Sequence, residues 1–172
     1  MTSPTAAVAT AADMPEVTAL RTRVFVEEQG VPAEIEQDDA DATAVHVLSR
    51  GLCGGLAGRV VATGRLVLRG TTAGIGRMAA DPAVRGRGHG SAVLAELHRQ
   101  AVRLGITEIE LHAQLPARGF YERAGYTAVG DVYEEAGIAH ISMRLKLTAA
   151  ADGTGVTDRS ACEKTRPVRP SE

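Results

Sequence analysis

The feature that most constrains this chain is a run of alternating glycines at residues 85–91, with the sequence Arg-Gly-Arg-Gly-His-Gly-Ser. The run lies between a predicted strand that ends near Ala80 and an amphipathic segment over residues 92–104. Glycines let the backbone approach a ligand closely, and a following helix adds unpaired N–H groups and the positive end of its dipole. The segment therefore predicts an anion-binding loop that suits a pyrophosphate.

Spacing separates this loop from other glycine-rich nucleotide sites. A P-loop requires Lys and then Ser or Thr after its last glycine, and no lysine lies near Gly90. Gly74 and Gly76 match the start of the dinucleotide fingerprint, but Asp81-Pro82 follows where its helix should begin. The remaining alternative to an anion-binding loop is a glycine-rich surface turn with solvated arginines.

The segments around the loop predict a βαβ unit. Apolar residues recur at helical spacing after the loop, at Val93, Leu94, Leu97, Ala101 and Leu104. The next segment alternates, with Ile109, Leu111 and Ala113 apolar and Glu108, Glu110 and His112 polar, as in a strand with one buried face. A right-handed crossover makes the two strands parallel and puts the glycine loop at their carboxyl ends.

The rest of the chain predicts one α/β domain with a mixed, mostly antiparallel sheet. We expect an N-terminal segment with a first strand at 1–12, the domain at 13–147, and a disordered tail at 148–172, which lacks aromatics and periodicity. Within the domain, a helix begins near Asp13 and a polar loop spans 30–41. Strands are predicted at 45–49, 56–68, 72–79, 126–132 and 138–147, and a helix at 116–124.

Two motifs carry a resemblance to a known family. Arg85-x-x-Gly88-x-Gly90 resembles the Arg/Gln-x-x-Gly-x-Gly/Ala signature that grips the coenzyme A pyrophosphate in the GNAT acyltransferases. Residues 120–126 are similar to the Phe-Tyr-x-x-x-Gly-Phe/Tyr segment of many of these enzymes. The ElaA branch of this family is similar to three further segments, at residues 21–29, 113–114 and 137–143. The resemblance therefore covers roughly residues 14–147.

The resemblance implies a GNAT fold and an acetyl-CoA-dependent N-acetyltransferase without a metal. An amine of the acceptor, a small molecule or a peptide, would attack the thioester directly in a ternary complex. Main-chain N–H groups near 78–80, where GNAT strands bulge, would meet the negative charge on the thioester oxygen. The cofactor-binding residues implied are Met78, Ala79, Ala80, Arg85, Gly86, Arg87, Gly88, His89, Gly90, Ser91, Gln114 and Tyr121.

The implied chemistry needs a base more than an acid. An alkyl ammonium with a pKa of about 10.4 must lose its proton, which costs about 4 to 5 kcal/mol at neutral pH, whereas a thiol with a pKa near 8.5 leaves easily. By resemblance Tyr121 is the acid that protonates the sulfur; its alternative role is packing under the cofactor. The candidate bases are His112, Glu134, Glu28 and His140, and no spacing chooses among them. Both histidines also fit hydrogen-bonded sheet residues.

An acidic segment precedes the first long strand of the sheet. We expect it either to be a solvated charge run or to attract a cationic amine. Its spacing lacks the central glycine of a calcium loop. The acidic residues are Glu34, Glu36, Asp38, Asp39 and Asp41.

Composition narrows the partners. The net charge of −2 argues against a nucleic-acid partner, and the absence of an apolar run of about 18 residues argues against a membrane. Two cysteines, Cys53 and Cys162, make no disulfide framework, so a reducing cytoplasm is expected. Neither lies in a nucleophile setting, which disfavours a covalent acyl-enzyme. The sequence is compatible with a homodimer and does not decide the oligomeric state.

Two other functions are compatible with the sequence. Arg21, Phe25 and the Glu36-Gln37-Asp38 run are similar to an autoinducer synthase pattern, although those proteins usually need early tryptophans and this chain has none. A non-catalytic acyl-CoA sensor would keep the glycine loop and lose the amine site. Tyr121 argues against a sensor.

Overall fold

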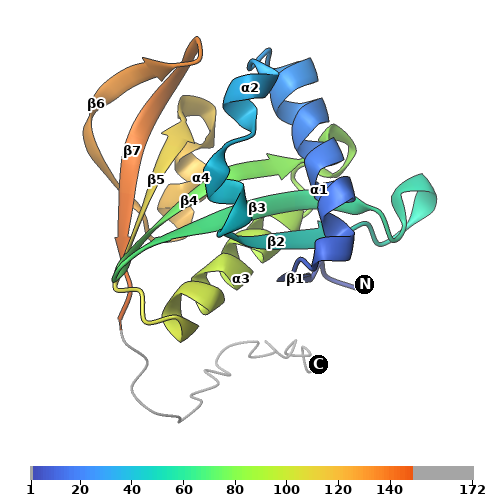
Figure 1. Ribbon diagram of the computed structural model, residues 1–172, viewed down its shortest axis with the longest axis horizontal. Coiled ribbons are helices and arrows are strands. Elements are labelled where there is room, and N and C mark those ends of the chain that lie inside the picture. The colour runs from blue at the N-terminus through green and yellow to red at the C-terminus, as the bar shows by residue number, and fades with distance from the viewer. Residues whose placement is uncertain (1, 149–172) are drawn as a thin grey trace, which may run out of the picture.

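The described part of the chain, residues 2–148 of a computed structural model, is built on one seven-stranded sheet (Figure 1). Its spatial order is β1-β2-β3-β4-β5-β7-β6. All neighbouring strands are antiparallel except β4 and β5, which confirms the predicted mixed sheet with one parallel pair. The strands are β1 Ala6–Val8, β2 Val45–Arg50, β3 Val60–Arg69, β4 Thr72–Ala80, β5 Glu108–Gln114, β6 Thr127–Glu135 and β7 Ile138–Lys146.

Helices cover both faces of the sheet (Figure 1). On one face lie α1 Met14–Arg21, a π-helical continuation Thr22–Glu28, and the short α2 Ala33–Glu36. On the other face lie α3 His89–Arg103 and α4 Arg118–Arg123. Single 3₁₀ turns span Ala11–Asp13, Asp39–Ala42, Gly54–Leu56, Pro82–Val84 and Leu115–Ala117. No helix within residues 2–148 is long and apolar enough to cross a membrane.

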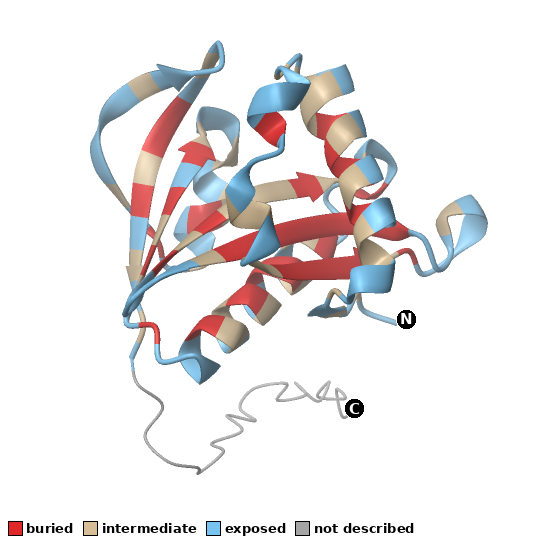
Figure 2. Cartoon of the chain, viewed as in Figure 1, coloured by how far each residue is buried: buried red, intermediate tan, exposed pale blue. Residues whose placement is uncertain are grey.

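Two apolar clusters hold these layers together, and Figure 2 shows them as buried stretches of the central strands and of the inward helix faces. The larger one lies under α3 and α4 and includes Leu66, Leu97, Ile109 and Met143, all fully buried. The smaller one lies under α1 and is centred on Leu20. Because full burial of one such side chain contributes about 1.5–3 kcal/mol, these clusters fix the positions of α1 and α3 on the sheet.

Strands β4 and β5 separate toward their carboxyl ends. Their parallel pairing covers only Thr72–Ile75 of β4, and β4 then continues to Ala80. On its other side β4 carries a bulge, because Gly64 of β3 lies opposite two residues, Arg77 and Met78. A bulge adds a residue and bends its strand. The separation leaves space between the two strands on the face that α1 and α2 cover.

Several element boundaries differ from the sequence-based expectation. Helix α3 begins at His89 rather than at 92, because Gly88 adopts a φ of 91° and ends the loop earlier. Segment 30–41 contains α2 and a 3₁₀ turn rather than loop alone. The strand expected from 56 begins at Val60, because a turn occupies Gly54–Leu56. Of the predicted tail, residues 149–172 lie outside the described residues.

Candidate active site

The glycine loop joins the end of β4 to the first turn of α3. Gly86 and Gly88 have φ values of 76° and 91°, a backbone conformation that favours glycine. The Arg87 N–H donates to the Val84 carbonyl at 3.1 Å, which closes the turn before the loop. The N–H groups of the first helical turn have no intrahelical acceptor, so the loop and α3 together offer donors and a positive dipole end to an anion.

The side chain of His89 is buried at the start of α3. The Ser49 hydroxyl donates to the Thr5 carbonyl at 2.7 Å, and the His89 Nδ1–H therefore donates to Ser49 Oγ at 2.8 Å. Burial, and then the charge of Arg87, lowers the pKa of His89, so the ring is neutral near pH 7. His89 can serve the predicted anion site only through its main-chain N–H, while its ring fixes α3 to β2.

Arg85 of the loop is paired with Glu28 at the end of the π-helical segment. Its two terminal nitrogens lie 2.6 and 2.7 Å from the Glu28 carboxylate oxygens, and its Nε donates to the Ala80 carbonyl. The hydrogen bonds from Arg85 hold the pKa of Glu28 below its ordinary value. Glu28 is thus occupied at the loop, away from the cavity described next, which argues against it as the base. Arg87 forms no ion pair within residues 2–148 and is the freer loop arginine.

A cavity of about 330 Å³ opens where β4 and β5 separate. Its floor includes Gly76, and a Cβ added there would meet no atom within 4 Å. Tyr121, the bulge residues Arg77 and Met78, and His112 also line it. The walls come from residues 25–36 on one side and the β6–β7 hairpin on the other, and Figure 1 shows these two segments on either side of β4 and β5. The volume is typical of a small-molecule site.

Tyr121 lies at the inner end of this cavity on α4. The residue is 7% exposed, and burial raises the pKa of its hydroxyl to about 12. Its ring meets Phe120 and Tyr126 edge-on, with centroids 5.0 and 5.8 Å away. Phe120 in turn lies beside Gly90 of the first turn of α3. Tyr121 is therefore rigidly held, protonated at neutral pH and able to donate a proton.

The candidate bases differ in where their side chains lie. His112 lines the cavity, its ring is about half exposed, and its two nitrogens lie 3.7 Å from Glu110 Oε1 and 3.7 Å from Glu135 Oε2. His140 also lines the cavity, but its Nδ1 is 2.7 Å from the Ile138 carbonyl oxygen, and its ring stacks on Tyr133. The structure therefore brings His112, but not every candidate, into an open polar setting.

Glu134 is exposed and does not line the cavity, whereas its neighbour Glu135 does. Successive residues of a strand point to opposite faces, and β6 has an irregularity between Val129 and Tyr133 that hides its register from the sequence. The one sequence signal that could have identified Glu135 is strand alternation, because Glu135 lies two residues after Tyr133 and therefore on the same face of β6. Glu135, rather than Glu134, is therefore the carboxylate of this pair that lies at the cavity.

Gln114 is engaged by a residue that the sequence analysis did not single out for the site. Its Nε2 donates to Gln29 Oε1 at 2.8 Å, and the reverse contact measures 3.4 Å. This amide pair joins the end of β5 to the segment after the π-helical turn, and both residues line the cavity. Gln114 lies at the cavity, where the sequence analysis put a cofactor contact, and its amide is already paired.

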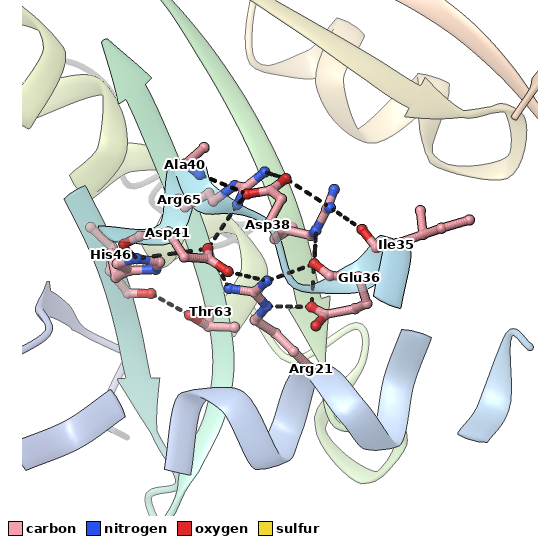
Figure 3. A network of polar contacts seen from close by, with 11 residues as sticks. Arg21, Ile35, Glu36, Asp38, Ala40, Asp41, His46, Thr63 and Arg65 are labelled. Carbon is pink, nitrogen blue, oxygen red and sulfur yellow. Dashed lines mark hydrogen bonds and ion pairs between the residues drawn. The ribbon is translucent and has the colours of Figure 1, made fainter. Parts of the chain in front are cut away.

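Three residues of the acidic segment are neutralised by arginines from other elements (Figure 3). This corrects, for these three residues, both the solvated charge run and the attraction of a cationic amine that the sequence suggested. Glu36 and Asp41 pair with Arg21 of α1, and Asp38 and Asp41 pair with Arg65 of β3. Burial acts to raise the pKa of Asp41, but hydrogen bonds from the two arginines outweigh it and hold the value at about 2. These three carboxylates are paired with arginines and are not free to attract an amine, although 40% of the Asp38 side chain remains exposed.

Of the five acidic residues, only Glu34 and Asp39 are exposed and lie outside that network. The sequence could not reveal the pairing, because Arg21 and Arg65 come from distant elements. Within residues 2–148, no cluster of three or more His, Cys, Asp or Glu side chains could hold a metal ion.

Comparison with known proteins places this geometry in a family. The family model of the acetyltransferase (GNAT) domain matches residues 13–147. The Bacillus subtilis protein YyaT is 31% identical over 144 residues, which are 82% of this chain and 94% of YyaT. A solved acyl-CoA N-acyltransferase from Pseudomonas aeruginosa is 31% identical, with a TM-score of 0.69 over 83% of this chain and 99% of that one.

Escherichia coli ElaA shares the fold as well, at 24% identity and a TM-score of 0.69, over 82% of this chain and 98% of ElaA. The α/β fold with its parallel β4–β5 pair is thus the GNAT fold that the sequence motifs predict. The chain belongs to the GNAT acetyltransferase family.

Proposed function

We propose that this protein transfers the acetyl group of acetyl-CoA to a primary amine by direct attack. The observation that carries the proposal is the placement of two features along one strand: the glycine loop follows the end of β4, and the cavity lies at the bulge of the same strand. A ligand with a diphosphate at one end and a reactive thioester at the other could fill both.

The loop would hold the diphosphate through the N–H groups of residues 86–91 and the charge of Arg87. Arg85, which is paired with Glu28, would stabilise the conformation of the loop. Main-chain N–H groups at Met78, Ala79 and Ala80, beside the bulge, would then stabilise the negative charge that develops on the thioester oxygen. One or two such donors in a dry site each contribute about 3 to 4 kcal/mol.

In the reaction, the amine nitrogen attacks the thioester carbon, the C–N bond forms and the C–S bond breaks. His112 is the base that this geometry favours, because its half-exposed ring lines the cavity and lies 3.7 Å from a carboxylate oxygen of Glu110 and of Glu135. The acceptor ammonium first loses one proton to His112, directly or through water, and the nitrogen loses a second proton to solvent after the C–N bond forms. Tyr121 gives its hydroxyl proton to the departing sulfur and regains one from solvent.

Calorimetry with acetyl-CoA tests the proposal. Gly88→Asp places a carboxylate at the start of α3, where it should repel the diphosphate. Gly58→Asp is the matched control: Gly58 also has a positive φ, of 75°, and open space around it, but it lies in the β2–β3 turn. Micromolar binding that Gly88→Asp abolishes and Gly58→Asp retains would support the proposal and justify an amine screen. Failure of the unmodified protein to bind acetyl-CoA would refute it.

A further inference from the structure

Arg77 occupies the bulge of β4 with a φ of 51°, the left-handed region that favours glycine. A non-glycine residue persists in this conformation only where the surroundings stabilise it, and such residues cluster at functional sites. The side-chain contacts of Arg77 therefore need an explanation.

The guanidinium of Arg77 reaches across the cavity wall to α2. Its Nε donates to the Glu36 carbonyl at 2.9 Å, and its Nη2 donates to the Ile35 carbonyl at 3.0 Å and lies 3.3 Å from Asp38 Oδ2. In Figure 3 the oxygens of Ile35, Glu36 and Asp38 lie around one guanidinium; Ile35 and Glu36 are the last residues of α2, and Asp38 follows it. Carbonyls at the end of a helix lack intrahelical donors, so they are natural partners for an arginine.

Helix α2 has little stability of its own. It spans four residues, and helices this short do not persist in water without outside contacts. Arg21 donates to the same Glu36 carbonyl at 3.0 Å from the side of α1. Arg21 therefore holds α2 to α1, and Arg77 holds it to β4.

The two segments that Arg77 joins form different parts of the cavity. Ile35 and Glu36 belong to the wall on the α1 side, whereas Arg77 and Met78 belong to the bulge where the thioester would lie. We infer that Arg77 is a positioning residue, which fixes the spacing between the acceptor-side wall and the thioester-binding main chain. This inference rests on the proposed function. Lysine cannot replace the arginine fully, because its single ammonium lacks the fork that spans two carbonyls.

Arg77→Gly and Arg77→Gln test the inference. The first keeps the bulge conformation without strain, and the second keeps most of the side chain without its charge. Arg69→Gln is the matched control: Arg69 lines the same cavity but forms no ion pair within residues 2–148, so its loss removes a charge without a tether.

The first readout is hydrogen exchange, which requires no turnover. The Glu36 and Gln37 N–H groups bond to the Pro32 and Ala33 carbonyls, at 3.1 and 3.3 Å, and report on α2. Both Arg77 variants should speed their exchange about tenfold, the effect of losing hydrogen bonds from a charged donor. The Arg69 variant should leave it unchanged, and β4 amides should stay protected in all three.

The second readout is steady-state kinetics with a responsive amine. The Arg77 variants should raise the acceptor KM about tenfold, with acetyl-CoA affinity within about twofold, because no hydrogen bond or ion pair within residues 2–148 joins α2 to the glycine loop. Unchanged exchange at residues 36 and 37 overturns the inference, as does faster exchange throughout β4, which would make Arg77 a general support of the sheet. Faster α2 exchange with an unchanged acceptor KM also overturns it. Inactivity of the unmodified protein on all amines counts against the proposed function alone.

Discussion

Gly64 of β3 and Gly76 of β4 lie on adjacent strands but face opposite sides of the sheet, so an added methyl group should have opposite effects at the two positions. At Gly64 a Cβ would lie 2.4 Å from Met78 Sδ and 2.9 Å from Leu97 Cδ1. Both contacts are too short to persist. Leu97 is fully buried, so Met78, the bulge residue, must move.

The magnitude follows from two opposing effects. Overpacking a filled core costs about 1–3 kcal/mol, and replacing glycine by alanine within regular structure returns about 0.5–1 kcal/mol. Gly64→Ala should therefore lower the free energy of unfolding by about 0.5–2 kcal/mol, or the Tm by about 1–8 °C for a chain of this size. A displaced Met78 should also lower kcat, because the bulge presents the main-chain N–H groups.

Gly76→Ala is the comparison, since its Cβ would enter the open cavity and its φ is ordinary. Its Tm should equal or exceed that of the unmodified protein, while the acceptor KM rises because the cavity becomes smaller. Thermal unfolding of the three proteins at one concentration measures the difference. A Gly64→Ala protein as stable as the unmodified one, or a Gly76→Ala protein destabilised as much as Gly64→Ala, would refute the assignment of the two faces.

Three further predictions concern the acid, the carboxylate beside His112 and the acidic segment. Tyr121→Phe keeps the packed ring and removes the hydroxyl proton, so kcat should fall at least about 100-fold while the affinity for acetyl-CoA stays unchanged. Steady-state kinetics measures the first effect and calorimetry the second. An unaltered kcat across pH would exclude Tyr121 as the acid. Glu135→Gln should lower kcat, because it removes a carboxylate that lies 3.7 Å from the His112 ring, whereas Glu134→Gln, the neighbour that does not line the cavity, should behave as the unmodified enzyme. Equal effects would contradict the register of β6. The folded-state pKa of Asp41 is about 2 against an ordinary 3.8, so its ionisation stabilises the fold by about 2 kcal/mol above pH 4, and this contribution disappears as the pH falls through 2. Acid titration of the free energy of unfolding should show a shallower decline between pH 4 and 2 for Asp41→Asn; an identical slope would contradict the low pKa.

Features that depend on residues close together in the chain were predictable from the sequence. The glycine loop followed by an apolar 3.6-residue period predicts a loop that ends in a buried helix, and α3 has that form. The alternation over 108–114 predicts a strand with one buried face, and β5 buries Ile109, Leu111 and Ala113. Backbone conformation and side-chain periodicity are local properties, so short windows of sequence carry them.

The composition of the candidate site depends on contacts between distant segments, and there the sequence was insufficient. The acidic segment reads as a charged loop until α1, β3 and β4 bring Arg21, Arg65 and Arg77 against it. Gln29 gains its place at the cavity only through Gln114, 85 residues further along the chain.

Register is a second reason. A bulge in β4 and an irregularity in β6 decide which residues face the cavity, and a shift of one residue exchanges Glu134 for Glu135. The sequence by itself thus determined the family, the fold and the glycine loop that opens α3, because these depend on local patterns. Only the tertiary structure decided which charges are neutralised and which side chains meet in the cavity, because those depend on pairing between segments that no local pattern specifies.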